Sequence, residues 1–465
     1  MLTREENELL TRVGPGTPMG NLIREFWIPA LPSNEFPTPD SPAKRMRLLS
    51  ENLVMFRDSD GNVGCFPESC PHRGASLYFG RSEEGGLRCI YHGWKFKVDG
   101  QCLEMPSEPE TSNYKDKVRI RAYPCRDVNH MIWIYMGPRE TPPPFPAFDV
   151  NLIPEENAFP PIIMMEEANW FQNLEGDTDS VHLDWLHARL RADVPVIGRG
   201  HIRGTFSPMK NPFVQAKPAE YGAFYTARRK VGDTDRYWHR INQFIFPIFT
   251  MVGGDSEQAH LRAHVPVDDT HSMLISLGGY RNRAMTEEER NSRIFQDPFH
   301  PTGGYVERTS NPLTYFHTVA NKDSDYWRDM EVEKTEMMSG VPFVMNLQDR
   351  AMTELMANAA GEPIYDRTRE HLGTTDGMCI IVRRQLIRAA SAHLEDGTVP
   401  PNVDDAELNH VRHACVGLDI DGDWVAASEA QRYSQEEHKC LCNHVLSMGE
   451  DTDPANMPAE VLGLA

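Results

Sequence analysis

Two short stretches stand out in this sequence: Cys-Pro-His-Arg-Gly-Ala at residues 70–75 and Cys-Ile-Tyr-His-Gly-Trp-Lys-Phe at residues 89–96. Each pairs one cysteine with one histidine, as Cys-x-His and then Cys-x2-His, and each is predicted to be a turn between strands. Two such turns can hold one metal centre between them. The candidate ligands are Cys70, His72, Cys89 and His92.

Two kinds of metal centre fit these four ligands. A zinc ion would take all four on one tetrahedral site. A Rieske [2Fe–2S] cluster would take both cysteines on one iron and both histidines on the other. Pro71, Gly74 and Gly93 let the backbone approach closely, and N–H groups near cluster sulfurs tune the potential. These neighbours favour the cluster.

A second candidate metal site lies within residues 169–187, where His182 and His187 are separated by four residues and Asp179 precedes His182 by three. On a helix Asp179 shares a face with His182, whereas residues five apart point about 140° away from each other. Both histidines reach one metal only if the helix is distorted, for example by a π-bulge. Two histidines and one carboxylate form the facial triad of non-haem Fe(II) oxygenases.

The carboxylate of this triad has to come from elsewhere in the chain, and Asp349 is the main candidate. It begins a predicted helix whose apolar residues are expected to face inward, and a charge among them needs a partner. Asp177 and Glu175 are the alternative third ligands. The inward-facing residues are Leu347, Met352, Leu355 and Met356.

These motifs closely resemble the Rieske-type oxygenases. Residues 19–27, 348–352, 366–373 and 383–387 extend the resemblance to the phthalate dioxygenase group, over nearly the whole chain. The resemblance implies a Rieske [2Fe–2S] cluster and a mononuclear Fe(II), with Asp349 as the iron carboxylate. It also implies that Asp179 links an iron histidine to a cluster histidine of a neighbouring subunit. That arrangement implies a head-to-tail homotrimer, or a dimer of trimers.

The same resemblance implies an oxygenase that uses O2 to oxidise an aromatic carboxylate, by ring hydroxylation or by O-demethylation. The chain has no FAD or NAD fingerprint, so a separate flavin and iron–sulfur NAD(P)H reductase is expected. An arginine is expected to bind the substrate carboxylate. The candidates for carboxylate binding are Arg199, Arg203, Arg228 and Arg229, and those for an apolar cavity are Phe244, Phe246, Ile248 and Met251.

The pattern along the chain predicts an α+β protein with an N-terminal all-β domain. Thr3 and Glu6 match a capping box, so residues 1–40 are predicted to be an N-terminal helical segment. Residues 41–140 form the predicted Rieske domain, and residues 147–465 form a catalytic α+β domain. Its antiparallel sheet is expected to carry helices on one side. Strands are predicted at 53–56, 63–66, 95–98, 101–103, 132–136, 162–165, 223–230, 241–252, 259–266 and 272–279, and helices at 286–296, 324–339, 343–360, 379–393 and 404–412.

Composition limits the remaining possibilities. There are 47 basic and 68 acidic residues, a formal charge of −21, which argues against nucleic acid as the main partner. No apolar run approaches a membrane span, and the first residues lack a signal pattern, so a cytoplasmic protein without a membrane partner is expected. The alternatives are a non-catalytic Rieske electron-transfer protein and a zinc-stabilised binding protein. A tail cluster of Cys440, Cys442, His438 and His444 is a weak further metal candidate.

Overall fold

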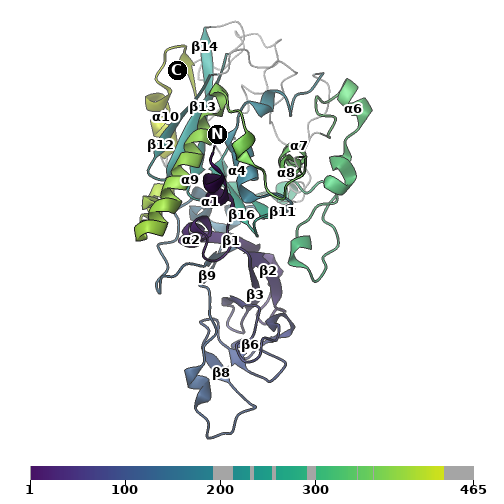
Figure 1. The fold of residues 1–465 in the computed structure, drawn as a ribbon, viewed down its shortest axis with the longest axis vertical. Helices are drawn as coiled ribbons and strands as arrows, with labels where there is room; N and C mark the ends of the chain where they lie inside the picture. Colours follow the sequence, from purple (N-terminus) through teal and green to yellow (C-terminus); the bar gives the residue numbers. More distant parts are fainter. Residues whose placement is uncertain are drawn as a thin grey trace.

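The computed structural model describes residues 2–191, 213–230, 235–253, 258–290, 300–342, 344–359 and 361–433. The molecule is elongated, with small sheets at one end and a large sheet with its helices at the other (Figure 1). No helix in these ranges is both long enough and apolar enough to cross a membrane.

The N-terminal segment begins with the helix that its capping box predicts. In α1 (Arg4–Thr11) the Thr3 hydroxyl accepts from the Glu6 N–H at 3.1 Å, and the Glu6 carboxylate accepts from the Thr3 N–H at 2.8 Å. After α2 (Pro18–Arg24) the chain becomes β1 (Trp27–Pro32), which is fully buried. Residues 1–40 are therefore not helical throughout. The partners of β1 in a three-stranded antiparallel sheet are β10 (Met131–Tyr135) and β9 (Cys125–Val128).

Two small antiparallel sheets follow and carry the first predicted metal site. The strands predicted at 53–56 and 63–66 pair as β3 and β4, and those predicted at 95–98 and 101–103 pair as β7 and β8. A separate small core of apolar side chains lies between these strands. The strands are β2 (Lys44–Leu48), β3 (Glu51–Arg57), β4 (Val63–Pro67), β5 (Arg81–Glu83), β6 (Gly86–Arg88), β7 (Lys95–Phe96) and β8 (Cys102–Glu104).

The larger part of the chain is built on an eight-stranded antiparallel sheet. The predicted antiparallel sheet is confirmed, but the strands at 213–219 and 414–419 are not among the predicted ones, and the strand predicted at 241–252 is divided into two. The order is β11-β17-β16-β15-β14-β13-β12, and β18 also pairs with β14. The strands are β11 (Ile162–Glu166), β12 (Phe213–Ala219), β13 (Gly222–Lys230), β14 (Arg236–Ile245), β15 (Phe249–Met251), β16 (Gln258–Pro266), β17 (Ser272–Tyr280) and β18 (Ala414–Asp419).

Helices cover both faces of this sheet, so the expectation of helices on one side is wrong. Successive residues of a strand face opposite sides. The Tyr225 hydroxyl donates to the Asp177 carbonyl of α4 (Trp170–Thr178), while the Phe224 ring lies 5.5 Å from Trp424 of α10 (Trp424–Tyr433). Residues 222–227 of β13 are all buried, because both of its faces are apolar and both need cover.

The helix predictions hold in part. The pattern at 379–393 becomes α9 (Gly377–Asp396), and that at 343–360 becomes α7 (Met345–Thr353) and α8 (Leu355–Ala359). Thr286 and Glu289 form the expected cap, although residues 291–296 lie outside the described ranges. The single helix predicted at 324–339 is wrong.

The 324–339 segment is interrupted because Asp325 and Tyr326 adopt left-handed backbone angles, with φ of 47° and 52°. Only α6 (Met330–Thr335) is α-helical there. The helix predicted at 404–412 is also wrong, since this stretch holds only a short 3-10 turn, Ala406–Asn409. The Asn409 side chain donates to the Asn402 carbonyl at 3.0 Å, and such side-chain bonds compete with helix formation.

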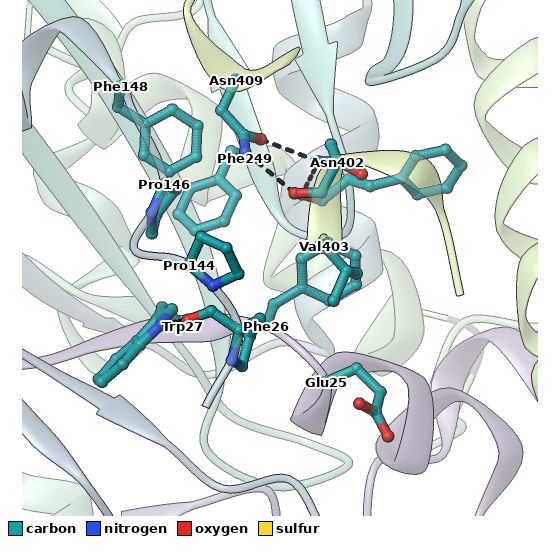
Figure 2. A pocket seen from close by; sticks show the side chains of 12 residues that line it. Glu25, Phe26, Trp27, Pro144, Pro146, Phe148, Phe249, Asn402, Val403 and Asn409 are labelled. Atoms are coloured by element: carbon teal, nitrogen blue, oxygen red, sulfur yellow. Dashed lines mark hydrogen bonds between the residues drawn. The ribbon is translucent and has the colours of Figure 1, made fainter. Parts of the chain in front are cut away.

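The proline-rich segment at residues 141–146, which connects the cluster domain to the large sheet, packs tightly where the two parts of the molecule meet. The Trp27 indole N–H donates to the Pro143 carbonyl at 3.0 Å. Trp27, Pro144 and Phe148 line a cavity of about 10 Å³. Figure 2 shows these side chains together with the hydrogen-bonded pair Asn402 and Asn409, which also line the cavity. A cavity of this size holds at most one water. The junction is therefore closely packed.

Candidate metal centres

The two cysteine loops have the same backbone geometry. In each, the cysteine N–H donates to the carbonyl five residues later at 2.8 Å, and its carbonyl accepts from Gly74 or Gly93 at 2.9 Å. Both glycines have positive φ, 76° and 79°, which favours glycine. A Cβ on Gly93 would lie 2.5 Å from Pro106 Cγ. The glycines of the motif therefore shape the loops that present Cys70 and Cys89.

The four donors of these loops suit two metal ions better than one. Cys70 and Cys89 are buried, whereas His72 and His92 reach the surface with their rings 4.4 Å apart. Within the described residues, no three of these donors lie within 4.8 Å of one another, as the ligands of one ion do. Burial, more than the facing Cys89 thiol, raises the pKa of Cys70 to about 11, so binding of metal has to displace its proton.

The histidine motif does not lie on one helix, so the expectation of a distorted helix, for example with a π-bulge, is wrong. Helix α4 ends at Thr178, Asp179 is extended, and a 3-10 turn follows at His182–Asp184. The Asp179 carboxylate accepts from the Val181 N–H at 2.7 Å. Such a side-chain turn competes with the helix, which explains why the helix ends here. The break, and not a bulge, lets both histidines face the same point.

His182, His187 and Asp349 meet at that point. The Nε2 atoms of His187 and His182 lie 3.0 and 3.5 Å from Asp349 Oδ1, and the donors of all three residues lie within 4.8 Å of one another. Two donors roughly 2.1 Å from one ion and at right angles are about 3.0 Å apart. The spacing therefore suits adjacent ligands of a single ion.

The hydrogen bond to Gln348 leaves His187 Nε2 unprotonated, as a metal ligand must be. The Gln348 amide N–H2 donates to the Val341 carbonyl at 2.9 Å, so its oxygen is the atom that faces His187 Nδ1, at 2.7 Å. That oxygen accepts the Nδ1 proton, which leaves Nε2 with a lone pair. Nε2 is buried without a hydrogen-bond partner and faces the Asp349 oxygen. Two facing acceptors need a cation between them, so these residues fit a metal ion.

Asp179 holds the other histidine. Its Oδ2 lies 3.4 Å from His182 Nδ1, which leaves the Nε2 of His182 toward Asp349. Burial alone would lower the pKa of His182, but Asp179 and Asp349 raise it overall. Burial alone would raise the pKa of Asp179, but the bond from His182 lowers it overall. Asp179 therefore stays a carboxylate beside the candidate metal ligand His182.

Helix α7 carries Asp349, but the later apolar residues of α7 and α8 do not face inward as predicted. Leu347 is buried, whereas Met352, Leu355 and Met356 are exposed. These three line an open pocket of about 1040 Å³, together with His182 and Asp349. The prediction that these residues face inward is therefore confirmed for Leu347 alone, and the other three border a pocket and not the core.

The alternative carboxylates serve other contacts. Asp177 pairs with Arg262 and lies 2.9 Å from His264, on the sheet side of α4. Glu175 pairs with Arg367 at 2.8 Å and also with Arg383 of α9. Both carboxylates therefore bind α4 to neighbouring elements and do not join the histidine pair.

The arginines proposed for substrate binding have other contacts where they are described. Arg229 donates to the Ser180 carbonyl and to Asp184, both at 3.1 Å, and so fixes the turn that carries His182. Arg228 lies over the Phe213 and Tyr237 rings. Arg199 and Arg203 lie outside the described residues, as do Cys440, Cys442, His438 and His444. The proposed cavity residues Phe244, Phe246, Ile248 and Met251 belong to the main buried core.

Sequence reasoning missed the buried polar side chains behind α7. The Gln348 side chain is fully buried, and Glu166 of β11 lies 3.4 Å from the Asn346 amide. Burial raises the pKa of Glu166 to about 8. Arg350 and Glu354 form a buried pair, and the Tyr326 hydroxyl donates to Glu354 at 2.6 Å. The position of Gln348 beside Asp349 was the only signal in the sequence.

Comparison with known families matches both parts of the chain. The Rieske [2Fe–2S] domain family matches residues 26–122, and the family described as LigXa C-terminal domain like matches residues 134–438. The second match covers more than half of the chain. The protein belongs to the Rieske non-haem iron oxygenases. Members of this family carry a Rieske cluster and a mononuclear iron, which excludes the zinc-binding alternative.

Relatives of known activity also belong to oxygenases of this kind. The chain is 36% identical to the 3-chlorobenzoate-3,4-dioxygenase oxygenase subunit of Comamonas testosteroni, over 88% of this chain and 93% of that protein. It is 35% identical to the phthalate 4,5-dioxygenase oxygenase subunit of Pseudomonas putida, over 84% and 87%. It is 32% identical to the 5,5'-dehydrodivanillate O-demethylase oxygenase subunit of Sphingobium sp. (strain NBRC 103272 / SYK-6), over 83% and 80%. The protein is therefore an oxygenase subunit, not a non-catalytic electron carrier.

A solved structure supports the fold. The carbazole 1,9a-dioxygenase oxygenase, crystallised with its ferredoxin, superposes with a TM-score of 0.50 at 16% identity, over 85% of this chain and 98% of that one. This Rieske oxygenase therefore combines an all-β cluster domain with a catalytic domain built on an antiparallel sheet.

Proposed function

We propose that this Rieske oxygenase oxidises an aromatic carboxylate with O2, at an iron held by His182, His187 and Asp349 and supplied with electrons by a [2Fe–2S] cluster on Cys70, His72, Cys89 and His92. The observation that supports this proposal most directly is that two histidine nitrogens and one carboxylate oxygen lie close together beside an open pocket. The three relatives above are named for aromatic acids, which supports this substrate class.

The bound iron would supply O2 activation, since a two-histidine, one-carboxylate set leaves positions open. The chain's own residues orient the metal ligands and shape the substrate pocket. Gln348 and Asp179 orient the two histidines through their Nδ1 atoms. Trp185 and Leu186 give the pocket apolar walls, which suit an aromatic ring and exclude water.

Arg328 joins the candidates for binding the substrate carboxylate. It is the only arginine or lysine among the described residues that line the pocket, and its partner Glu333 is partly exposed. A substrate carboxylate can take the place of Glu333 on the guanidinium. Arg328→Gln is expected to raise the KM for an aromatic acid severalfold while kcat changes little. An unchanged KM would exclude Arg328.

Electrons are proposed to come from a separate NAD(P)H reductase that carries flavin and an iron–sulfur centre. The support is the absence of a nucleotide fingerprint in this sequence and the separate ferredoxin of the carbazole dioxygenase. The cluster loops expose Ile90 and Tyr91, and Phe79 is exposed nearby, which offers an apolar docking surface. A cytoplasmic location stays a prediction.

We also propose that the cluster of one subunit serves the iron of a neighbouring copy, in a trimer or a dimer of trimers. The strand β6 beside Cys89 and the helix α7 that carries Asp349 lie in different parts of the elongated chain (Figure 1). Asp179 lines the open pocket, where the partly exposed His92 of a second copy can approach it.

Co-expression of two inactive variants tests this arrangement. His92→Ala is expected to lose the cluster, and Asp349→Ala the iron. Mixed assemblies of the two should recover part of the turnover, because an intact cluster can lie beside an intact iron site. Each variant expressed alone is the control. Mixed assemblies that stay inactive while both centres are present would exclude transfer between subunits.

The catalytic proposal is tested by NADH-driven turnover with a generic reductase over a panel of aromatic acids. Formaldehyde from a methoxylated acid indicates O-demethylation, and a cis-diol indicates ring dihydroxylation. Either product supports the proposal. Protein that holds both metals but shows no O2-dependent NADH use with any acid contradicts it.

A further inference from the structure

Four methionines surround the pocket that opens on the candidate iron ligands. Met330, Met338, Met352 and Met356 are exposed by 57, 38, 46 and 41%, and all four line this pocket. Every other methionine within the described ranges is buried. Exposed thioethers are therefore concentrated at one place, which we term the methionine rim.

Two observations show that the exposed methionines are placed at the pocket. Met337 and Met338 are neighbours in the chain, yet Met337 packs in a small buried cluster while Met338 lines the pocket. On α7, Met352 lies three residues after Asp349, on the same helix face. The rim thus lies beside the proposed iron ligand and not merely somewhere on the surface.

The thioether is the side chain in this pocket that most readily accepts an oxygen atom. Methionine is oxidised to its sulfoxide, a reversible change that turns an apolar side chain polar. Leucine fills a similar volume but offers no such atom. A pocket lined only for apolar contact does not need four thioethers.

The proposed function supplies an oxidant at this place. When electrons arrive and no substrate is bound, two electrons and two protons reduce O2 to hydrogen peroxide. Peroxide then transfers one oxygen to a methionine sulfur: the O–O bond breaks, an S–O bond forms, the sulfur loses two electrons, and the second oxygen leaves as water. Each event consumes one peroxide and one thioether.

We propose that the methionine rim is a sacrificial oxidation site, which takes up peroxide as it leaves the iron pocket and so protects the iron ligands. This inference rests on the proposed function, because O2 reduction at this site is the source of the peroxide. Peroxide formed inside the pocket meets the rim before it reaches bulk solvent.

The test maps methionine sulfoxide by peptide mass spectrometry in the full-length holoprotein. The protein is given NADH, reductase and O2 without an aromatic acid, with catalase present to remove peroxide from bulk solvent. Sulfoxide is expected at the four rim positions despite catalase, while the adjacent Met337 stays reduced. Asp349→Ala, which lacks the iron site, should keep its rim reduced under the same conditions.

The outcomes separate this inference from the proposed function. O2-dependent NADH use with no more sulfoxide at the rim than at Met337, or with equal sulfoxide in Asp349→Ala, overturns the inference alone. No O2-dependent NADH use overturns the proposed function, and the inference with it.

A variant with leucine at all four rim positions tests protection itself. It is expected to lose mononuclear iron severalfold faster than the native protein for each NADH consumed, as measured by metal analysis after each cycle. Loss at the native rate would overturn the protective role.

Discussion

Gln348 Oε1 lies 2.7 Å from His187 Nδ1, although the two residues are 161 positions apart in the chain. The same amide donates to the Val341 carbonyl and to the Ser339 hydroxyl at 3.1 Å, so its orientation is determined on both sides. The bond selects the imidazole tautomer that leaves Nε2 toward Asp349. Partners of this kind also restrict the ring's rotation.

Gln348→Met is expected to lower the affinity of the iron site for metal by roughly 10- to 100-fold, the usual effect of removing such a partner. The substitution removes the acceptor at His187 Nδ1 and keeps the volume similar. Titration of metal-depleted protein with Co(II), with the cluster intact, measures the change.

Gln348→Glu is the matched control, because a carboxylate still accepts the His187 proton although it cannot donate to Val341. It should bind metal more tightly than Gln348→Met. Equal affinity in the Met variant and the native protein would mean that the bond does not position His187.

Asp349→Ala is expected to lose mononuclear iron and to keep the cluster absorption spectrum, because the two predicted centres share no ligand. Iron analysis and visible spectroscopy measure the two centres separately. Met352→Leu alters the same face of α7 without removing a proposed ligand, and should keep both centres. Full iron occupancy in Asp349→Ala would point to a different third ligand.

Asp179→Ala is expected to keep both metal centres but to abolish coupled turnover, because Asp179 orients His182 and lies in the proposed electron path. Rapid mixing of reduced protein with substrate and O2 measures how fast the cluster is reoxidised. Asp179→Asn keeps an acceptor near His182 and should retain a larger share of this rate. Near-normal turnover in the alanine variant would remove Asp179 from the path.

Glu166→Gln is expected to stabilise the fold increasingly as the pH rises. Burial raises the pKa of Glu166 to about 8, above its ordinary value of 4.5. Between these values the folded protein keeps a proton that the unfolded chain has released. Native stability therefore falls with rising pH, by about 1.4 kcal/mol per pH unit from this group, until it levels off above the folded pKa. The amide removes this dependence.

Chemical denaturation at pH 5, 6.5 and 8 measures the difference between the native protein and Glu166→Gln. The neighbouring Glu167 is the control, because its pKa is lowered in the folded protein whereas the pKa of Glu166 is raised. The bond from His317 lowers its pKa to about 2, so it contributes stability above its ordinary pKa, lost only as the pH falls toward 2. Glu167→Gln should destabilise at all three pH values. A Glu166→Gln difference that does not change with pH would contradict the assigned protonation.

Much of the architecture followed from local pattern. The cap at Thr3, several strands of the cluster domain and most strands of the large sheet depend on neighbouring residues, and they form where predicted. The helices predicted at 324–339 and 404–412 do not form. In the first, residues with left-handed backbone angles interrupt the helix, and in the second, asparagine side-chain hydrogen bonds replace helical backbone bonds. Neither feature has a clear signature in the hydrophobic pattern.

The kinds of metal ligand were decided by local sequence, because a Cys-x-His turn and a closely spaced histidine pair carry their chemistry within a few residues. Tertiary contacts decided how the second site is built. Helix α4 ends at Thr178, Asp349 meets histidines from a distant segment, and Gln348 selects the tautomer of His187. Met352 of α7 and Met356 of α8 border a pocket and not the core. Each of these features depends on which distant segments pack together, and the helical or strand periodicity of the sequence does not determine that packing.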